Sequence, residues 1–273
     1  KSGTVWSICM MNMILHNRPD AHIEHGDTIE DPAFTLKGGG VKKRDGVIAN
    51  PPFSQNYNKA NVKIESRFRY GWAPEKGKKA DLMFVQHMIA SLKDKGVMAT
   101  IMPHGVLFRG GQERVIREEI INDNIIEAII GLPQGLFYGT GIPACVLFIN
   151  NNKPDELKDK IFFINADAEF AEGKPQNKLR PEDIEKIDYV FTNKKNIPKY
   201  SRLVDKKEIV LKDYNLNIRR YVDNTPETEP EDVKAHLIGG IPLKEVEARK
   251  HILKKFRIEH SIIFEPKKTD RLK

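Results

Sequence analysis

The stretch Val47-Ile48-Ala49-Asn50-Pro51-Pro52-Phe53 decides the fold of this chain, because an apolar strand stops there at a rigid turn. Each proline fixes φ at about −65° and removes a backbone N–H, and the residue before a proline is kept out of the helical region. The strand can therefore neither continue nor become a helix. Its end presents an amide side chain, free carbonyl groups and an aromatic ring.

The chemistry that suits this edge is methyl transfer to a planar amino group. Such an amine offers two hydrogens, which the side-chain oxygen of Asn50 and the carbonyl oxygen of Pro51 can accept. Both bonds draw electron density onto the nitrogen as it attacks a methyl sulfonium. Phe53 can stack on the base that carries the amine. The bare tripeptide is also a common turn, but the apolar strand before it favours the functional interpretation.

Further motifs follow along the chain after the tetrapeptide and extend to residue 242. They are 67–71 (RFRYG), 79–81 (KAD) followed by Phe84 and His87, 103–111 (PHGVLFRGG), 131–137 (GLPQGLF), 140–148 (TGIPACVLF), 213–218 (DYNLNI) and 239–242 (GGIP). In this order they resemble the methylation subunit of type I restriction-modification systems, a family of adenine-N6 DNA methyltransferases.

The resemblance implies S-adenosylmethionine as cofactor and DNA as substrate. It implies that Asn50, Pro51, Pro52 and Phe53 hold a flipped adenine as the catalytic residues, and that Asp27 accepts a hydrogen bond from the adenine of the cofactor. Asp after Gly is also a routine turn or helix cap. The family further implies a specificity subunit that reads the DNA sequence, and possibly a restriction subunit, as partners.

The start of the chain departs from the family. There, the helix predicted at 4–16 follows a glycine-rich cofactor loop and an acidic residue, whereas this sequence contains no G-x-G-x-x-G pattern, and Gly38-Gly39-Gly40 lies in a charged loop. We therefore expect an N-terminally truncated fragment that is inactive by itself. A second hypothesis is a non-catalytic DNA-binding or assembly fragment. An RNA adenine methyltransferase or a protein-glutamine methyltransferase could use a similar edge, but the basic aromatic loop and the matching C-terminal half favour DNA.

Charge and aromatic residues predict a nucleic-acid surface. The formal net charge is +7 and the pI is about 9.2, which suits a polyanion. Cations for phosphates and flat rings for bases are interleaved in the loop after the tetrapeptide. The DNA-binding candidates there are Arg67, Arg69, Tyr70, Trp72, Lys78 and Lys79. The alternative is a solvated surface loop whose aromatic rings pack into the body.

Alternating helix and strand patterns predict an α/β fold. The resemblance makes this a partial Rossmann-like methyltransferase sheet, mostly parallel, with an antiparallel edge hairpin. Expected strands are 22–25, 46–49, 97–102, 125–130 and 144–149, and expected helices are 4–16, 81–94 and 112–121. Three parts are predicted. The first is a partial catalytic domain at 1–150, and the second is an extension at 151–224 with short strands at 161–164 and 209–211 and a helix at 181–187. The third is a segment at 225–273 with an acidic, proline-rich linker (225–232) and an amphipathic helix (242–256).

Composition indicates a cytoplasmic protein in a reducing compartment. The sequence has only two cysteines, no signal peptide pattern and no apolar run of membrane-spanning length. Its eight histidines have no cysteine or carboxylate partners at a familiar metal-binding spacing, so no metal site is predicted. No nucleophile motif such as G-x-S-x-G supports hydrolase chemistry.

Overall fold

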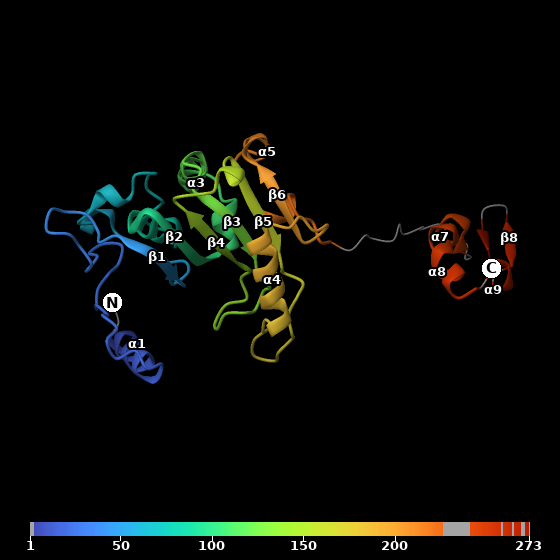
Figure 1. Ribbon diagram of the computed structural model, residues 1–273, viewed down its shortest axis with the longest axis horizontal. Helices are drawn as coiled ribbons and strands as arrows, with labels where there is room; N and C mark the ends of the chain where they lie inside the picture. The colour runs from blue at the N-terminus through green and yellow to red at the C-terminus, as the bar shows by residue number, and fades with distance from the viewer. Residues whose placement is uncertain (1–2, 226–240, 258, 264, 269–270, 273) are drawn as a thin grey trace. The chain divides into compact units, whose positions relative to one another are not determined.

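A computed structural model of the protein describes residues 3–225, 241–257, 259–263, 265–268 and 271–272. It contains two compact units, Lys1–Asn224 and Thr225–Lys273. Figure 1 shows the first unit as a sheet with helices on both faces. Within the described residues, none of the helices combines the length and the apolar character that crossing a membrane requires.

The first unit contains six strands and five α-helices among its described residues. The strands are β1 (Arg44–Ala49), β2 (Leu92–Pro103), β3 (Ile126–Gly131), β4 (Ala144–Asn150), β5 (Lys160–Asn165) and β6 (Ser201–Asp205). The helices are α1 (Gly3–Leu15), α2 (Asp81–Ala90), α3 (Gln112–Asn122), α4 (Pro181–Asn193) and α5 (Lys206–Leu211). The second unit has the short helices α7 (Leu243–Ala248), α8 (Lys250–Lys255) and α9 (His260–Ile263), and an antiparallel sheet of β7 (Ile241–Pro242), β9 (Arg271–Leu272) and β8 (Pro266–Lys268).

The strands of the large sheet are ordered β1-β2-β4-β3-β5-β6. β1 pairs with β2 and β3 with β5 in parallel, whereas β4 is antiparallel to both of its neighbours and β6 is antiparallel to β5. Four of the six strands therefore run in one direction, which confirms a mostly parallel α/β sheet. The predicted position of the antiparallel pair was wrong, because β5 and β6 extend the sheet beyond β3 and leave β4 in its interior.

Alternating side chains along each strand separate two cores. On β3, Ile129 joins the larger core with α2 and α3, while Ala128 and Ile130 join the smaller core under α4. This is the period of two expected for strands buried on both faces. α2 and α3 lie on one side of the sheet and α4 on the other (Figure 1).

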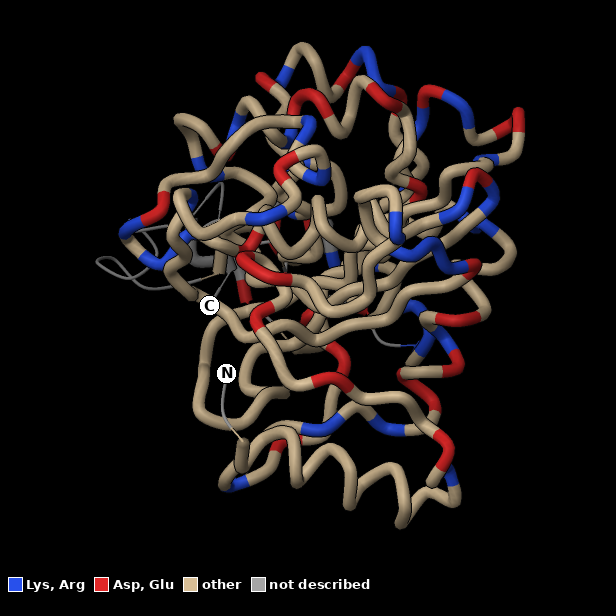
Figure 2. The backbone as a smooth tube through the Cα atoms, turned by 90° about the vertical axis from the view of Figure 1, so that its left-hand side faces the viewer, with Lys and Arg blue, Asp and Glu red and all other residues tan. Residues whose placement is uncertain are grey.

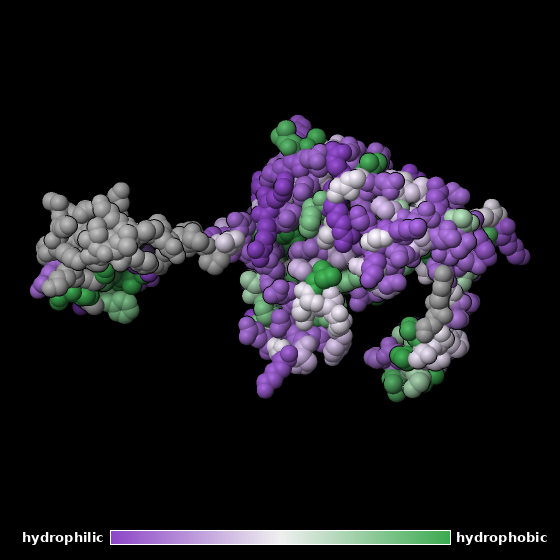
Figure 3. All heavy atoms as spheres, turned by 180° about the vertical axis from the view of Figure 1, so that it is seen from behind, coloured by the Kyte–Doolittle hydropathy of each residue, from purple (hydrophilic) through white to green (hydrophobic). Residues whose placement is uncertain are grey.

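Apolar surface is exposed at the start of the chain and on β1. Helix α1 carries no charged residue (Figure 2) and none of its residues is buried, and its apolar atoms form a green surface in Figure 3. The indole Nε1 of Trp6 donates to the carbonyl of Ile23 at 3.1 Å. On β1, Val47 and Ala49 pack against the larger core, whereas Ile48 is 87 % exposed on the α4 side of the sheet.

Several predicted elements differ from the structure. The expected strand at 22–25 has no regular structure, and the expected strand at 209–211 is the end of helix α5. Strand β6 was missed, although it completes the sheet. The single helix expected at 242–256 is two short helices that meet at Arg249. Of the predicted linker at 225–232, all but Thr225 lies outside the described residues.

The three-part division of the chain stays a prediction. In the structure, β5 and β6 of the predicted extension continue the sheet that begins with β1, so residues 151–224 and the preceding strands share one sheet.

Candidate active site

The tetrapeptide leaves the sheet at the carboxyl end of β1, beside the carboxyl end of β2. Ala49 pairs with Thr100 in parallel register, and the Thr100 hydroxyl donates to the Ala49 carbonyl at 3.2 Å. Asn50 follows directly and is exposed. Ligands of α/β sheets bind outside the carboxyl ends of parallel strands, so the structure places Asn50 where a substrate can reach it.

The chain turns sharply after Phe53. Ser54 has a φ of 57°, in the left-handed region, and its N–H donates to Oδ1 of Asp81 at 3.0 Å. The N–H of Ala80 donates to the Gln55 carbonyl at 3.0 Å. The start of α2 therefore holds the exit of the tetrapeptide from the sheet.

Phe53 meets a second aromatic ring from another loop. Its ring centroid lies 6.2 Å from that of Phe137, and the two planes are inclined by 71°. Phe137 belongs to the connection from β3 to β4, which begins at the same edge of the sheet. Two aromatic rings and an exposed amide thus lie together at one point.

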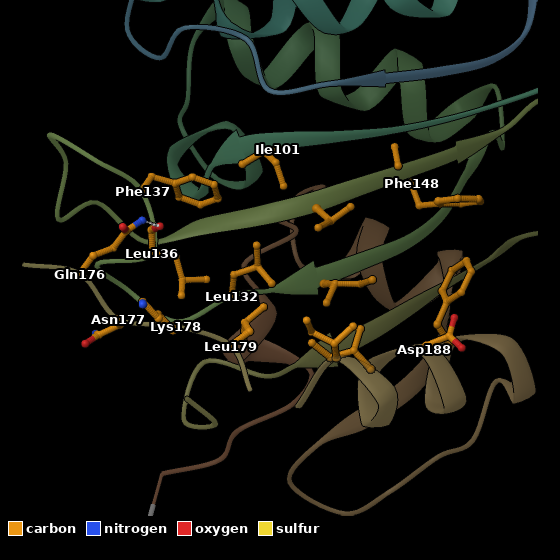
Figure 4. A pocket seen from close by; sticks show the side chains of 16 residues that line it. Ile101, Leu132, Leu136, Phe137, Phe148, Gln176, Asn177, Lys178, Leu179 and Asp188 are labelled. Atoms are coloured by element: carbon orange, nitrogen blue, oxygen red, sulfur yellow. Dashed lines mark hydrogen bonds between the residues drawn. The ribbon is translucent and has the colours of Figure 1, made fainter. Parts of the chain in front are cut away.

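The loop that carries Phe137 is fixed by residues just before α4. The side chain of Asn177 donates to the Gln134 carbonyl at 2.9 Å, and its backbone N–H donates to the Gly135 carbonyl at 2.9 Å. The Gln176 side-chain amide donates to the carbonyl of Leu136, the bond dashed in Figure 4. These bonds define where Phe137 sits relative to the sheet.

An apolar pocket of about 730 Å³ extends from this loop across the sheet. Figure 4 shows Leu136 and Phe137 towards one end of the pocket and Asp188 of α4 towards the other. Side chains of β2, β3 and β4, among them Ile101 and Phe148, form its floor. Its lining is dominated by aliphatic and aromatic groups, which suits an apolar or planar occupant.

Asp27 lies in a tight turn. Its Oδ1 accepts hydrogen bonds from the N–H groups of Ile29 at 3.0 Å and Glu30 at 2.9 Å, and its carbonyl accepts from the Asp31 N–H at 2.9 Å. The turn-cap interpretation of this aspartate is therefore realised in the structure. A role for Asp27 in cofactor binding stays a prediction.

Arg67 is buried, with 3 % of its surface exposed, and its guanidinium binds the turn that contains Asp27. It donates to the carbonyls of Thr28 at 2.8 Å and Ile29 at 2.5 Å. Burial lowers the pKa of Arg67 to about 10, against the attraction of the Asp27 carboxylate. The Arg67 guanidinium also contacts Nδ1 of His87 at 2.8 Å. Burial of His87 and the positive charge of Arg67 together lower the pKa of His87 to about 4. A buried Arg67 supports the Asp27 turn, and its burial argues against a phosphate contact.

The other predicted DNA contacts separate into two groups. Tyr70 is buried and its hydroxyl donates to Asp123, which also pairs with Arg69. Trp72 is partly buried, and its ring stacks on Tyr57 with an interplanar angle of 17°. These positions fit the alternative in which the aromatic rings pack into the body.

Arg69 and the two lysines of the set remain accessible, and the Arg69 side chain is 60 % exposed. Lys78 is exposed and has a φ of 59°. Lys79 is 39 % exposed, and its Nζ lies 3.6 Å from Oε2 of the buried Glu113.

Sequence reasoning missed three residues of this site. Phe137, Asp81 and Arg109 all lie in quoted motifs. Phe137 contacts Phe53, Asp81 binds Ser54, and Arg109 binds Asp81, so these contacts join residues 27 or more positions apart. The position of the motifs could have indicated these residues. The segments 103–111 and 131–137 each follow a strand that ends at the same edge of the sheet as β1. Taken together, an amide, a rigid carbonyl and two aromatic rings can hold a planar group that carries an amine.

Comparison with known proteins identifies the family of the chain. Residues 1–230 match the family model described as N-6 DNA Methylase. The chain is 38 % identical over 239 residues to the MjaVIII type I restriction enzyme methylase subunit of Methanocaldococcus jannaschii, covering 83 % of this chain and 40 % of that protein. It is 33 % identical over 259 residues to the MpnII methylase subunit of Mycoplasma pneumoniae, covering 91 % of this chain and 47 % of that protein.

A solved structure is similar over most of the chain. It is the methyltransferase subunit of a type I restriction-modification system from Streptococcus thermophilus, with a TM-score of 0.74, 36 % identity, and coverage of 82 % of this chain and 47 % of that one. The chain spans less than half the length of these relatives. The similarity confirms the predicted Rossmann-like methyltransferase fold and the predicted resemblance. This chain therefore belongs to the N-6 DNA methylase family.

Proposed function

We propose that this chain is part of the methylation subunit of a type I restriction-modification complex and holds a flipped DNA adenine for methylation at N6. The observation that carries the proposal is the pairing of Phe53 with Phe137 beside the exposed Asn50. Removing a base from the duplex requires a pocket that stacks on its faces and binds its Watson–Crick edge. The two rings and the Asn50-Pro51 edge supply those two kinds of contact.

The residues act on the amine through its hydrogens. The Asn50 side-chain oxygen and the Pro51 carbonyl accept the two N–H groups, which makes the nitrogen richer in electron density and fixes its direction. Because prolines cannot donate a backbone N–H at positions 51 and 52, the edge presents acceptors without a competing donor from those two residues. Phe53 and Phe137 hold the ring plane, and the turn at Ser54 fixes the whole edge.

S-Adenosylmethionine, which supplies an electrophilic methyl group on a sulfonium, is the cofactor we propose. The described residues fit it in part. Asp27 supplies an acidic group before β1, but the cavity beside its turn, lined by Gly26, Thr28 and Asp31, has a volume of only about 100 Å³, below the several hundred Å³ of most ligand pockets. These residues by themselves therefore do not form a cofactor pocket of the usual size.

DNA and the subunits of a type I complex are the proposed partners. Exposed lysines gather in the segment that follows the tetrapeptide, and the whole chain is basic. Such charges bind phosphates without reading sequence, which leaves recognition of the DNA site to a specificity subunit. The exposed lysines of this segment are Lys59, Lys63, Lys76 and Lys78.

A product analysis tests the proposal. The complete methyltransferase that contains this chain, with its specificity subunit, is incubated with isotope-labelled S-adenosylmethionine and with duplex DNA, RNA or protein. We expect label in N6-methyladenine of DNA, identified by mass spectrometry of the nucleosides. Label in RNA adenine or in protein glutamine would replace the DNA assignment with one of those two activities.

A further inference from the structure

A buried network of charged groups lies behind the tetrapeptide. Asp81, the first residue of α2, has a side chain only 1 % exposed; its Oδ1 accepts the N–H of Ser54, and its Oδ2 accepts from Nη1 of Arg109 at 3.0 Å. The same Nη1 donates to Oε1 of Glu113 at 3.1 Å. Glu113 is completely buried, and Lys79 lies 3.6 Å from its second oxygen. A hydrogen bond from a backbone amide to a buried carboxylate is strong and fixed in direction. Breaking it costs free energy, because it leaves a buried charge without its partner.

Arg109 is placed by its own loop. Its guanidinium lies against Gly105, where a Cβ atom would come within 2.5 Å of Nε and Nη2. The backbone carbonyl of Arg109 accepts from Nη1 of Arg117 at 2.9 Å, and the carbonyl of Leu107 accepts the Leu216 N–H at 2.8 Å. The loop after β2 is thus fixed from two sides, by α3 and by the 213–218 segment, and a Cβ atom at position 105 would displace the Arg109 guanidinium.

We propose that Asp81 is a positioning residue for the Asn50–Phe53 edge, and that Arg109 fixes Asp81 in the orientation that binds the Ser54 amide. This rests on the function proposed above. Ser54 has a left-handed φ, which a non-glycine residue adopts at a cost, so the turn needs its bond to Asp81. Without that bond, the backbone at Ser54, one residue from Phe53, can leave the left-handed conformation. The Asn50 side-chain oxygen and the Pro51 carbonyl then move relative to the amine.

The positional link is tested first without any reaction. Hydrogen exchange of the 273-residue chain is measured by mass spectrometry for Asp81→Ala, Gly105→Ala and wild type. Gly105→Ala changes no charge, and its methyl group drives the Arg109 guanidinium away from Asp81. We expect both variants to exchange faster at 53–57. Unchanged exchange there in both variants would overturn the proposal.

The consequence for catalysis is tested in the complete methyltransferase. For Asp81→Ala we expect a fall in kcat of about 100-fold, the effect of misplacing a reacting group by about 1 Å, with KM for the cofactor unchanged. Asp81→Asn keeps one acceptor oxygen for its two donors, the Ser54 N–H and Nη1 of Arg109, so we expect its kcat to lie between those of wild type and Asp81→Ala. A kcat for Asp81→Ala equal to wild type, or one no lower than that of Asp81→Asn, would also overturn the proposal.

Asp183 provides the matched control. Its side chain is 4 % exposed and accepts from Nη2 of Arg180 at 2.7 Å at the start of α4, so it is also a buried carboxylate paired with arginine in the first turn of a helix. Asp183→Ala should lower the melting temperature without changing exchange at 53–57 or kcat. Equal kcat losses in the two aspartate variants would show that Asp81 acts only through stability. If the wild-type enzyme transfers no methyl group, the proposed function fails, and the exchange measurement still decides the link from Asp81 to Ser54.

Discussion

The ring of Phe137 lies edge-on to that of Phe53, with centroids 6.2 Å apart and planes inclined by 71°. The two residues come from different loops that start at the same edge of the sheet, after β1 and after β3. Their contact brings a second aromatic ring to the strand end that carries Asn50.

Replacing Asn50 by alanine in the complete methyltransferase removes one acceptor for the amine. We expect kcat to fall by about 100- to 1000-fold, as for the loss of one preorganised hydrogen-bonding group at a reacting centre, while calorimetric titration still detects cofactor binding. Asn152→Ala, at an exposed asparagine just beyond the carboxyl end of β4, is the control and should keep full activity. Retained turnover in Asn50→Ala would remove this side chain from the mechanism.

Phe53→Ala and Phe137→Ala should each weaken binding of an extruded base. Stacking on one aromatic ring contributes about 1–3 kcal/mol, and because the two rings touch, we expect the double variant to lose less than the sum of the single losses. Fluorescence of 2-aminopurine at the target position reports the extruded base, and melting temperatures are measured in parallel. Additive losses would show that the rings act independently, and losses that follow the melting temperature would assign the rings to the core.

His87 should make the stability of the chain depend on pH. Its pKa is lowered from 6.5 to about 4 by burial and by Arg67, so between these values the unfolded chain binds the extra proton. The stabilisation is complete above about pH 6.5 and is lost as the pH falls towards 4, by about 2 to 3 kcal/mol. Melting temperatures from pH 7 to pH 4.5 should fall less steeply for His87→Gln than for wild type. The exposed-histidine variant His16→Gln serves as the control, and parallel curves for His87→Gln and wild type would contradict this assignment.

Gly131→Ala should destabilise the first unit. A Cβ at the end of β3 would lie 2.9 Å from Cδ1 of Ile218 and 3.3 Å from Oδ1 of Asn165, and overpacking of this kind costs about 1–3 kcal/mol. Gly46→Ala on β1 is the comparison, because nothing lies within 4 Å of its Cβ position. Urea denaturation of both variants measures the difference. Equal free energies of unfolding for the two variants would mean that Ile218 and the rest of the 213–218 segment can move away from the added methyl group without a loss of stability.

The sequence predicted the helices and strands whose own apolar pattern indicates which of their faces is buried. The helical apolar stripe at 81–94 and the buried strands at 97–102, 125–130 and 144–149 correspond to α2, β2, β3 and β4, with shifted ends. The segment 209–211 is apolar and β-branched like a strand, yet it continues a helical turn from Lys206, with Ile209 buried and Leu211 exposed. Strand propensity is easily overridden by such surroundings.

The site was predictable only where its residues are consecutive. The Asn50–Phe53 edge follows from proline stereochemistry, but Arg67 was predicted to contact DNA as one of the cations of the basic aromatic loop. Backbone carbonyls at Thr28 and Ile29, nearly forty residues earlier, account for its burial. The pairing of Phe53 with Phe137 likewise depends on strand order, and the position of β4 between β2 and β3 was not anticipated.

Strand β1 has one further consequence, for the behaviour of the chain in concentrated solution. Among the described residues it pairs only with β2, so the backbone groups of its other edge meet no strand, and Ile48 is 87 % exposed. An unpaired edge with an apolar run is a template for pairing with another chain. Charged residues at 42–45 precede the run, but Val47-Ile48-Ala49 itself carries no charge. The strand that ends at Asn50 is therefore also an edge at which the backbone of another chain can pair.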